Sequence, residues 1–254
     1  MTNAALPPPP RVRSAAIALF LDVDGTLVEI EREPGAVHVP EPLCQILAEL
    51  EQALDGAVAL VSGRSLEQLD RLFSPLRLSA AGLHGLERRN LRREVVRAEL
   101  DPAIFKAARR RLSTFADQHP GVLLEDKSLT LALHYRNAPG QQSAAAKVAK
   151  DAVAASRGAL GLLEGKMVFE LKPPGCDKGQ AIAAFMREAP FAGRQPVFAG
   201  DDVTDEAGFK VVNQLGGISI RIGADDRATA AAHGHGDVGT MQTWLADLLA
   251  AQAA

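Results

Sequence analysis

The sequence predicts an α/β protein with a doubly wound parallel sheet, interrupted by an inserted α+β module whose sheet has one open face. Apolar runs alternate with helical stretches in the first and last thirds, and the first run, 15–21, is apolar throughout. Strands buried on both faces have this character, and their alternation with helices is typical of a Rossmann-like sheet. In the middle third the strands alternate apolar and polar residues, which indicates a sheet covered on one side only.

The first third supplies three strands and two helices of the parallel sheet. The expected strands are 15–21, 57–61 and 77–82. Between the first two, residues 40–54 carry leucine and isoleucine at helical spacing. The second helix begins at Ser65, because Ser65 and Gln68 have the spacing of a capping box.

The middle third changes to a different pattern. The expected strands are 94–100, 121–127, 128–136, 158–165 and 166–171, and the expected helices are 102–119 and 141–156. Leu131 and Leu133 occupy one face of their strand, whereas Thr130 and His134 occupy the other. A strand with one apolar and one polar face belongs to a sheet with helices on one side. The polar face of this module is therefore free to cover a site.

The last third returns to the first pattern. The expected elements are a helix at 177–188, a strand at 195–200, a helix at 203–213, a strand at 217–222 and a closing helix. The domain boundaries follow from these changes. The expected domains are a disordered, proline-containing leader at 1–14, a core at 15–91 and 174–254, and the inserted module at 92–173.

The composition argues against several classes of protein, namely those that bind nucleic acid, bind or span a membrane, or are secreted. The 254 residues are 47% hydrophobic and 23% charged, with a net charge of −3, so nothing favours binding to nucleic acid or to a membrane surface. The apolar runs are too short for a membrane span, and the N-terminus lacks the pattern of a secretory signal. Two cysteines are too few for a disulfide framework, which favours the cytoplasm. The oligomeric state stays open, and a monomer is compatible with the sequence.

The candidate chemistry lies where the strands end, since ligands bind at the carboxyl ends of parallel strands. Asp22 and Asp24 follow the first strand and Asp201 follows a later one. A carboxylate can attack phosphorus, but two anions repel each other, so hard oxygen ligands and a phosphate together favour Mg²⁺. We interpret Asp22 as nucleophile and metal ligand, and Asp201 as completing the metal site. Asp24 is expected to be the general acid and base, with neighbouring carboxylates helping it to hold a proton.

The remaining core candidates are phosphate donors and further acids. Ser62 can donate to a phosphate oxygen, Gly63 offers a backbone N–H, and Arg64 follows in the same loop. Lys178 stands in the first turn of a helix, where a cation opposes the helix dipole, so anchoring a phosphate and the nucleophile is its expected role. The acids of the DDVTDE segment have two interpretations. Asp202 and Asp205 either cap a helix or serve the metal, and Asp205 is the better metal candidate.

A group of arginines follows the third strand. They are Arg88, Arg89, Arg92, Arg93 and Arg97. We interpret them as a solvated edge, with an anion site as the alternative.

The order of these motifs resembles that of the haloacid dehalogenase (HAD) superfamily of phosphatases: an aspartate pair, a hydroxyl, a lysine and an acidic cluster. The segments GLHGLERR, LEDKSLTLALHYR, KMVFELKPPGCDKG and FAGDDVTDE further resemble the trehalose-6-phosphate phosphatase family. The resemblance implies a HAD core with an inserted cap domain over the site. It also implies that the backbone carbonyl of Asp24 ligates Mg²⁺. The substrate-binding residues that it implies are His84 from the core and Glu125, Lys127, Arg136 and Glu170 from the cap.

The expected function is the Mg²⁺-dependent hydrolysis of trehalose 6-phosphate to trehalose and phosphate through an aspartyl phosphate. Three alternatives stay open. Another phosphatase, for sucrose phosphate or a hexose phosphate, would share the core, and a phosphomutase would share the nucleophile. A catalytically inactive module that senses sugar phosphates would typically lose Asp22 or Asp24, and both are present. The cap residues have an alternative interpretation as surface salt bridges.

Overall fold

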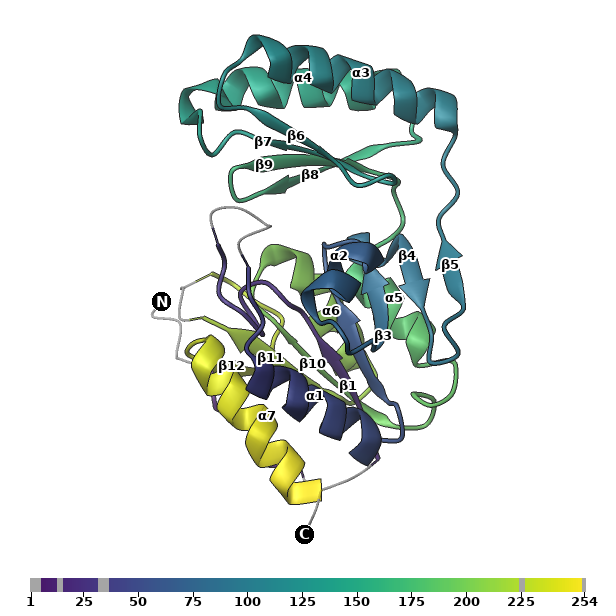
Figure 1. The fold of residues 1–254 in the computed structure, drawn as a ribbon, viewed down its shortest axis with the longest axis vertical. Helices are drawn as coiled ribbons and strands as arrows, with labels where there is room; N and C mark the ends of the chain where they lie inside the picture. The colour runs from purple at the N-terminus through teal and green to yellow at the C-terminus, as the bar shows by residue number, and fades with distance from the viewer. Residues whose placement is uncertain (1–5, 13–15, 32–36, 224–226, 253–254) are drawn as a thin grey trace. The chain divides into compact units, whose positions relative to one another are not determined.

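The computed structural model describes residues 6–12, 16–31, 37–223 and 227–252 (Figure 1). Contacts divide the chain into two compact units, one of residues 1–96 with 177–254 and one of residues 97–176. Of the leader expected at 1–14, residues 1–5 and 13–14 lie outside the described residues. Nearby, the N–H of Gly234 donates to the carbonyl of Pro7 at 2.9 Å, and Leu6 packs against the hydrophobic core.

The first unit contains an eight-stranded sheet in the order β12-β11-β10-β1-β2-β3-β4-β5. Its strands are β1 (Ile17–Leu21), β2 (Val58–Val61), β3 (Ser79–Gly82), β4 (Glu87–Arg89), β5 (Val95–Arg97), β10 (Gln195–Gly200), β11 (Ile218–Ile222) and β12 (His233–His235). β1 lies between β10 and β2 and is parallel to both, so Leu21 lies opposite Ala199 on one side and Leu60 on the other. The carboxyl ends of these three neighbouring strands therefore meet at one edge of the sheet.

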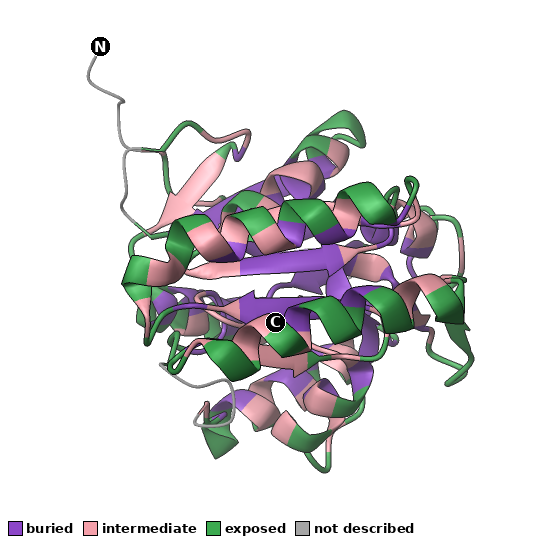
Figure 2. Ribbon diagram, turned by 90° about the horizontal axis from the view of Figure 1, so that it is seen from above, coloured by how far each residue is buried: buried purple, intermediate pink, exposed green. Residues whose placement is uncertain are grey.

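Helices pack against this sheet and bury their apolar faces. They are α1 (Glu41–Ala53), α2 (Leu66–Leu72), α5 (Lys178–Phe185), α6 (Glu206–Gln214) and α7 (Val238–Gln252). Figure 2 shows buried strands, while the helices carry buried and exposed stripes. The core includes Phe20, Phe185 and Phe191, whose ring centroids lie 4.9–5.9 Å apart. None of the helices in the described ranges has both the length and the apolar character that crossing a membrane requires.

The second unit is an antiparallel sheet with two helices on one face (Figure 1). The strand order is β6 (Leu123–Asp126), β7 (Leu131–His134), β9 (Val168–Lys172) and β8 (Gly161–Gly165). α3 (Pro102–Gln118) and α4 (Gln142–Ala155) pack on each other, and Leu131, Leu133 and Phe169 belong to the unit's own hydrophobic core. With the parallel sheet of the first unit, this confirms the predicted fold class.

Four local features differ from the expectations. β4 and β12 are strands where none was expected. β5, expected as a strand of the inserted module, belongs to the eight-stranded sheet because it pairs beside β4. The helix expected at 203–213 begins as a separate 3-10 turn, η4 (Val203–Asp205), before α6. The solvated-edge interpretation is wrong for Arg89, which is buried and pairs with Asp70 at 2.8 Å. Arg88 is also partly buried, because it pairs with Glu188 and its guanidinium lies over the ring of Phe185.

Candidate active site

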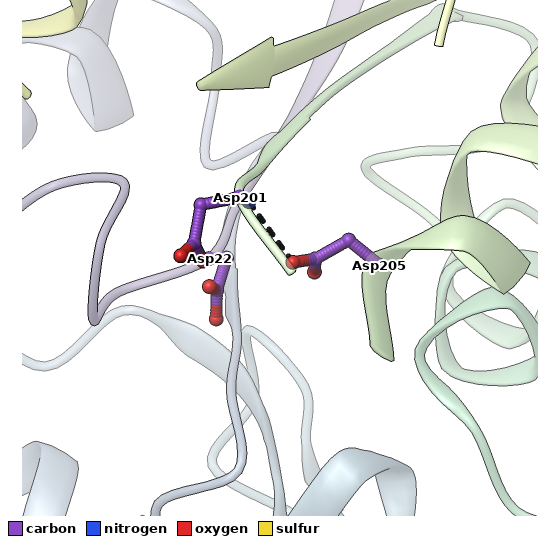
Figure 3. A group of neighbouring side chains, drawn as sticks. All are labelled: Asp22, Asp201 and Asp205. Carbon is purple, nitrogen blue, oxygen red and sulfur yellow. Dashed lines mark hydrogen bonds between the residues drawn. The ribbon is translucent and has the colours of Figure 1, made fainter. Parts of the chain in front are cut away.

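Three aspartates converge where β1 and β10 end (Figure 3). Asp22 follows β1, Asp201 follows β10 and Asp205 ends the η4 turn. Each offers a carboxylate oxygen, and these oxygens lie within 4.8 Å of one another. The chain at Gly25 passes close by: its φ is +83°, and a Cβ there would lie 2.2 Å from an Asp201 oxygen. Only glycine fits this position without displacing Asp201.

Lys178 binds two of these acids. Its Nζ lies 2.7 Å from Oδ1 of Asp22 and 2.7 Å from Oδ1 of Asp205. The other oxygen of Asp205 accepts the N–H groups of Asp201 and Asp202 at 3.0 and 2.9 Å. Asp205 is fully buried, so its carboxylate acts as a bridge between the lysine and the loop after β10.

The charges of this cluster do not cancel. Burial raises the pKa of Asp22 well above its ordinary value, and Asp205 and Asp201 add to this while Lys178 opposes it. Burial and the charge of Asp205 raise the pKa of Asp201 to about 7. Burial alone would lower the pKa of Lys178, but its two carboxylate partners outweigh it and raise the pKa. Three carboxylates, two of them buried and that of Asp201 partly buried, stand beside one ammonium and leave an excess of negative charge. Hard oxygen donors of this kind suit Mg²⁺.

The carboxylate of Asp24 has a partner that the sequence did not predict. Its carboxylate is bound by both arms of the Arg64 guanidinium, with Nη2 2.6 Å from Oδ1 and Nε 2.7 Å from Oδ2. A guanidinium fork matches a carboxylate in this arrangement. The partner of this carboxylate is thus a cation, and about a third (34%) of the Asp24 side chain is exposed.

The loop after β2 carries the phosphate-donor candidates. Ser62 is buried, and its Oγ accepts the N–H of Arg64 at 3.1 Å, which leaves the hydroxyl its own proton to donate. Gly63 lies against the imidazole of His84, because a Cβ at residue 63 would be 2.7 Å from His84 Cε1. The candidates Ser62, Gly63, Arg64 and His84 therefore lie together, beside Asp24.

In the second unit, three of the four candidates lie together. Nζ of Lys127 is 3.8 Å from Glu125 and 3.9 Å from Glu170. Glu125 and Glu170 both lie beside Ala132, from opposite neighbouring strands, so they share one face of the sheet. Arg136 follows the end of β7 and is exposed.

Two residues that were not candidates orient these acids. Thr130 is fully buried and donates its hydroxyl to Oε1 of Glu170 at 2.7 Å. Nε2 of His134 lies 3.0 Å from Oε2 of Glu125. Both residues stand two positions from Ala132, so the alternation of this strand already placed them on the face of the two glutamates.

The acidic loop after β10 has a further partner. Arg227 donates to the carboxylate of Asp202 and to the carbonyl of Asp201, both at 2.8 Å. Burial opposes ionisation of Asp202, but Arg227 and the N–H of Val203 outweigh it and lower the pKa. Asp202 also takes part in a capping box of the η4 turn. The group of acids in the described residues that could hold a metal ion contains Asp205, whereas Asp202 pairs with Arg227 and caps the η4 turn.

The chain is similar to known proteins in sequence and in fold. The family described as trehalose-phosphatase matches residues 20–235. The trehalose-6-phosphate phosphatase of Escherichia coli K12 is 47% identical over 232 residues, covering 91% of this chain and 86% of the relative. A probable trehalose-phosphate phosphatase of Sinorhizobium fredii is 46% identical, covering 81% and 77%. The solved C-terminal domain of a trehalose-6-phosphate phosphatase from C. albicans has a TM-score of 0.84 at 21% identity, covering 98% of this chain and 99% of that one.

Proposed function

Because the chain belongs to the trehalose-phosphatase family of phosphoric monoester hydrolases, we propose that it hydrolyses trehalose 6-phosphate in a Mg²⁺-dependent reaction through an aspartyl phosphate. One observation carries the chemistry. Asp22 is a buried carboxylate at a strand end, oriented by Lys178 at 2.7 Å and placed among two further carboxylates. Several carboxylates this close together are costly to bury unless further positive charge joins them, and a divalent cation would supply it.

The donor set of the cluster fits a divalent cation. We propose Asp22 and Asp201 as side-chain ligands, with Asp205 beside them and the backbone carbonyl of Asp24 as a further ligand. When Mg²⁺ is bound, its charge offsets the repulsion between the nucleophile and the phosphoryl group. The excess negative charge of the cluster supports this assignment, as does the raised pKa of Asp201, which a nearby cation would lower.

The reaction then proceeds in two steps. A carboxylate oxygen of Asp22 attacks phosphorus, and the P–O bond to the sugar breaks as Asp24 gives its proton to the leaving oxygen. Asp24 next takes a proton from water, whose oxygen attacks the aspartyl phosphate, releasing phosphate and restoring Asp22. Lys178 holds Asp22 in place, and Ser62 donates to a phosphate oxygen. Asp24 must leave Arg64 to reach the sugar oxygen, and the substrate phosphate is the anion that can replace it in the guanidinium fork.

The sugar is recognised by the face of the second unit that carries Glu125, Lys127 and Glu170. Carboxylates accept hydrogen bonds from the vicinal hydroxyls of glucose, while cations face phosphate. The bonds from Thr130 and His134 fix the two carboxylates before substrate arrives, which lowers the entropic cost of binding. Lys127 forms ion pairs with Glu125 and Glu170, as the salt-bridge interpretation expects. The sugar-binding proposal adds that the substrate also binds these three residues. Cys44 and Cys176 are both free thiols, which supports placing the enzyme in the cytoplasm.

Phosphate release from a panel of sugar phosphates tests the proposal. We expect trehalose 6-phosphate to give the highest kcat/KM, with activity lost in EDTA and restored by Mg²⁺. Asp22→Asn should abolish turnover while the circular dichroism spectrum stays unchanged, because an amide does not attack phosphorus. A higher kcat/KM for sucrose phosphate or a hexose phosphate would refute the assigned substrate. Full activity in EDTA, or in Asp22→Asn, would refute the assigned mechanism.

A further inference from the structure

The loop that carries Ser62, Gly63 and Arg64 is held by the turn that follows β3. The N–H of Leu83 donates to the carbonyl of Arg64 and the N–H of His84 donates to the carbonyl of Ser62, each at 2.9 Å. Two successive residues of the turn thus bind the backbone of the loop at both of its ends.

This turn has an unfavourable backbone conformation. Leu83 and His84 have φ values of 51° and 57°, in the left-handed region that residues with a Cβ rarely adopt. Both residues are buried, with 1% and 8% exposed. Strained backbone of this kind persists when its surroundings fix it, and it concentrates at functional sites. Here the two N–H groups and the contact of the His84 ring with Gly63 supply that constraint.

Glu87 binds the backbone just after the same loop, at the first residue of α2. It is the first residue of β4, is only 6% exposed, and accepts the N–H of Leu66 with Oε1 at 2.6 Å. A hydrogen bond to a charged acceptor is stronger than a neutral one. The bond passes beside Gly82, where a Cβ would lie 2.9 Å from Arg64 O, 2.9 Å from Leu66 N and 3.1 Å from Glu87 Oε1. Gly82 is therefore what lets the loop, the turn and Glu87 approach one another.

We propose that Glu87 is a positioning residue for phosphoryl transfer. It fixes the backbone at Leu66, and together with the left-handed turn it sets the Ser62 hydroxyl and the Arg64 guanidinium. Since Arg64 binds Asp24 at 2.6 Å, the same constraint reaches the proposed general acid. The inference rests on the proposed function in one respect, the use of Ser62 and Arg64 to bind the phosphoryl group.

Kinetics on p-nitrophenyl phosphate, with inorganic phosphate as the competitive inhibitor, test the proposal in the full chain with Mg²⁺. Glu87→Ala should raise both KM and the inhibition constant of phosphate by about 10-fold or more and lower kcat/KM by about 10- to 100-fold, since a misplacement of about 1 Å can cost about 100-fold. Partial unfolding lowers the concentration of active enzyme, and hence kcat, but leaves KM and the inhibition constant unchanged. A fall in kcat alone, or no change, would overturn the proposal.

Two further variants keep the test decisive if Glu87→Ala folds poorly. Glu87→Gln retains an acceptor oxygen for the Leu66 N–H and should recover most of the loss; a KM as high as that of the alanine variant would count against the proposal. Gly82→Ala pushes on the backbone of Arg64 and Leu66 and should raise KM in the same way. An unchanged KM in Gly82→Ala would show that the position of the loop does not matter.

A matched control separates positioning from stability. Asp70 lies on α2 and pairs with Arg89 of β4 at 2.8 Å and with Arg77 at 3.1 Å. Asp70→Asn weakens the contacts between the same two elements without touching the loop, so it should lower the melting temperature and leave KM and phosphate inhibition unchanged. If Asp70→Asn raises KM and the inhibition constant of phosphate as Glu87→Ala does, the effect of Glu87→Ala comes from general destabilisation and the proposal is wrong. The sugar-phosphate panel and Asp22→Asn decide the proposed function separately, because p-nitrophenyl phosphate needs no sugar recognition.

Discussion

The carboxylate cluster should make the stability of the metal-free protein fall as pH rises. The pKa of Asp201 is about 7 in the folded chain against 3.8 as its ordinary value. Between these values the folded state binds more protons than the unfolded state, so stability is lost as pH rises through the window and is lowest above pH 7. A difference of about three pKa units corresponds to about 4 kcal/mol over the whole window, and about 3 kcal/mol of this falls between pH 5 and pH 8. At about 2–4 °C per kcal/mol, the melting temperatures at these two pH values should differ by about 6–12 °C.

Thermal melting monitored by circular dichroism at pH 5 and pH 8, in EDTA and in saturating Mg²⁺, measures this effect. Asp201→Asn is the control, because it keeps the size of the side chain and removes its titration. In EDTA the wild-type protein should lose more stability from pH 5 to pH 8 than the variant does. Mg²⁺ should stabilise the wild type more at pH 8, since at pH 5 the cation competes with a proton. The same pH dependence in both proteins, or equal stabilisation by Mg²⁺ at both pH values, would refute the reasoning.

Three further predictions concern single side chains. Lys178→Met should abolish phosphate release, and in chemical denaturation in EDTA it should lower the free energy of unfolding by about 3–5 kcal/mol. The reason is that the variant leaves Asp22 and Asp205 buried without their cation. An unchanged free energy of unfolding would contradict these ion pairs. Glu170→Ala should reduce kcat/KM for trehalose 6-phosphate by about 10- to 1,000-fold, the loss expected when one or two charge-assisted hydrogen bonds are removed. It should leave kcat/KM for p-nitrophenyl phosphate nearly unchanged. Equal losses on both substrates would exclude a role in sugar recognition. Thr130→Val should show a smaller loss of the same selectivity, and Thr130→Ser should retain the activity; a serine variant as impaired as valine would exclude the hydroxyl.

Much of the fold follows from local patterns. β1 is an apolar run, most of β10 is apolar, and the acids that follow these two strands converge because the strands are parallel neighbours. The family resemblance is confirmed by the comparisons. The strands that were missed, β4 and β12, have three residues each and no apolar run. They are strands because β3 and β11 offer them free edges, which is tertiary information that a short window does not contain.

The site also has features that the sequence pattern can predict and others that it cannot. The positions of Thr130 and His134 on the face of the glutamates follow from the two-residue period of a strand, so a fuller use of that signal finds them. The pair of Asp24 and Arg64 joins residues 40 positions apart and depends on the side-chain rotamers at two strand ends. No local pattern specifies such a pair, so the sequence did not predict Arg64 as the partner of Asp24.

The order in which the chain is synthesised has a consequence for how the active site assembles. β1 needs β10 as a partner, so the sheet at Asp22 stays incomplete until about residue 200 has left the ribosome. The second unit is continuous, spans residues 97–176 and has its own hydrophobic core, so it can fold earlier. A nascent chain arrested before β10 would then combine a finished second unit with an exposed, fully apolar β1 strand. Such a strand is an aggregation hazard, and its protection during translation becomes a requirement for producing active enzyme.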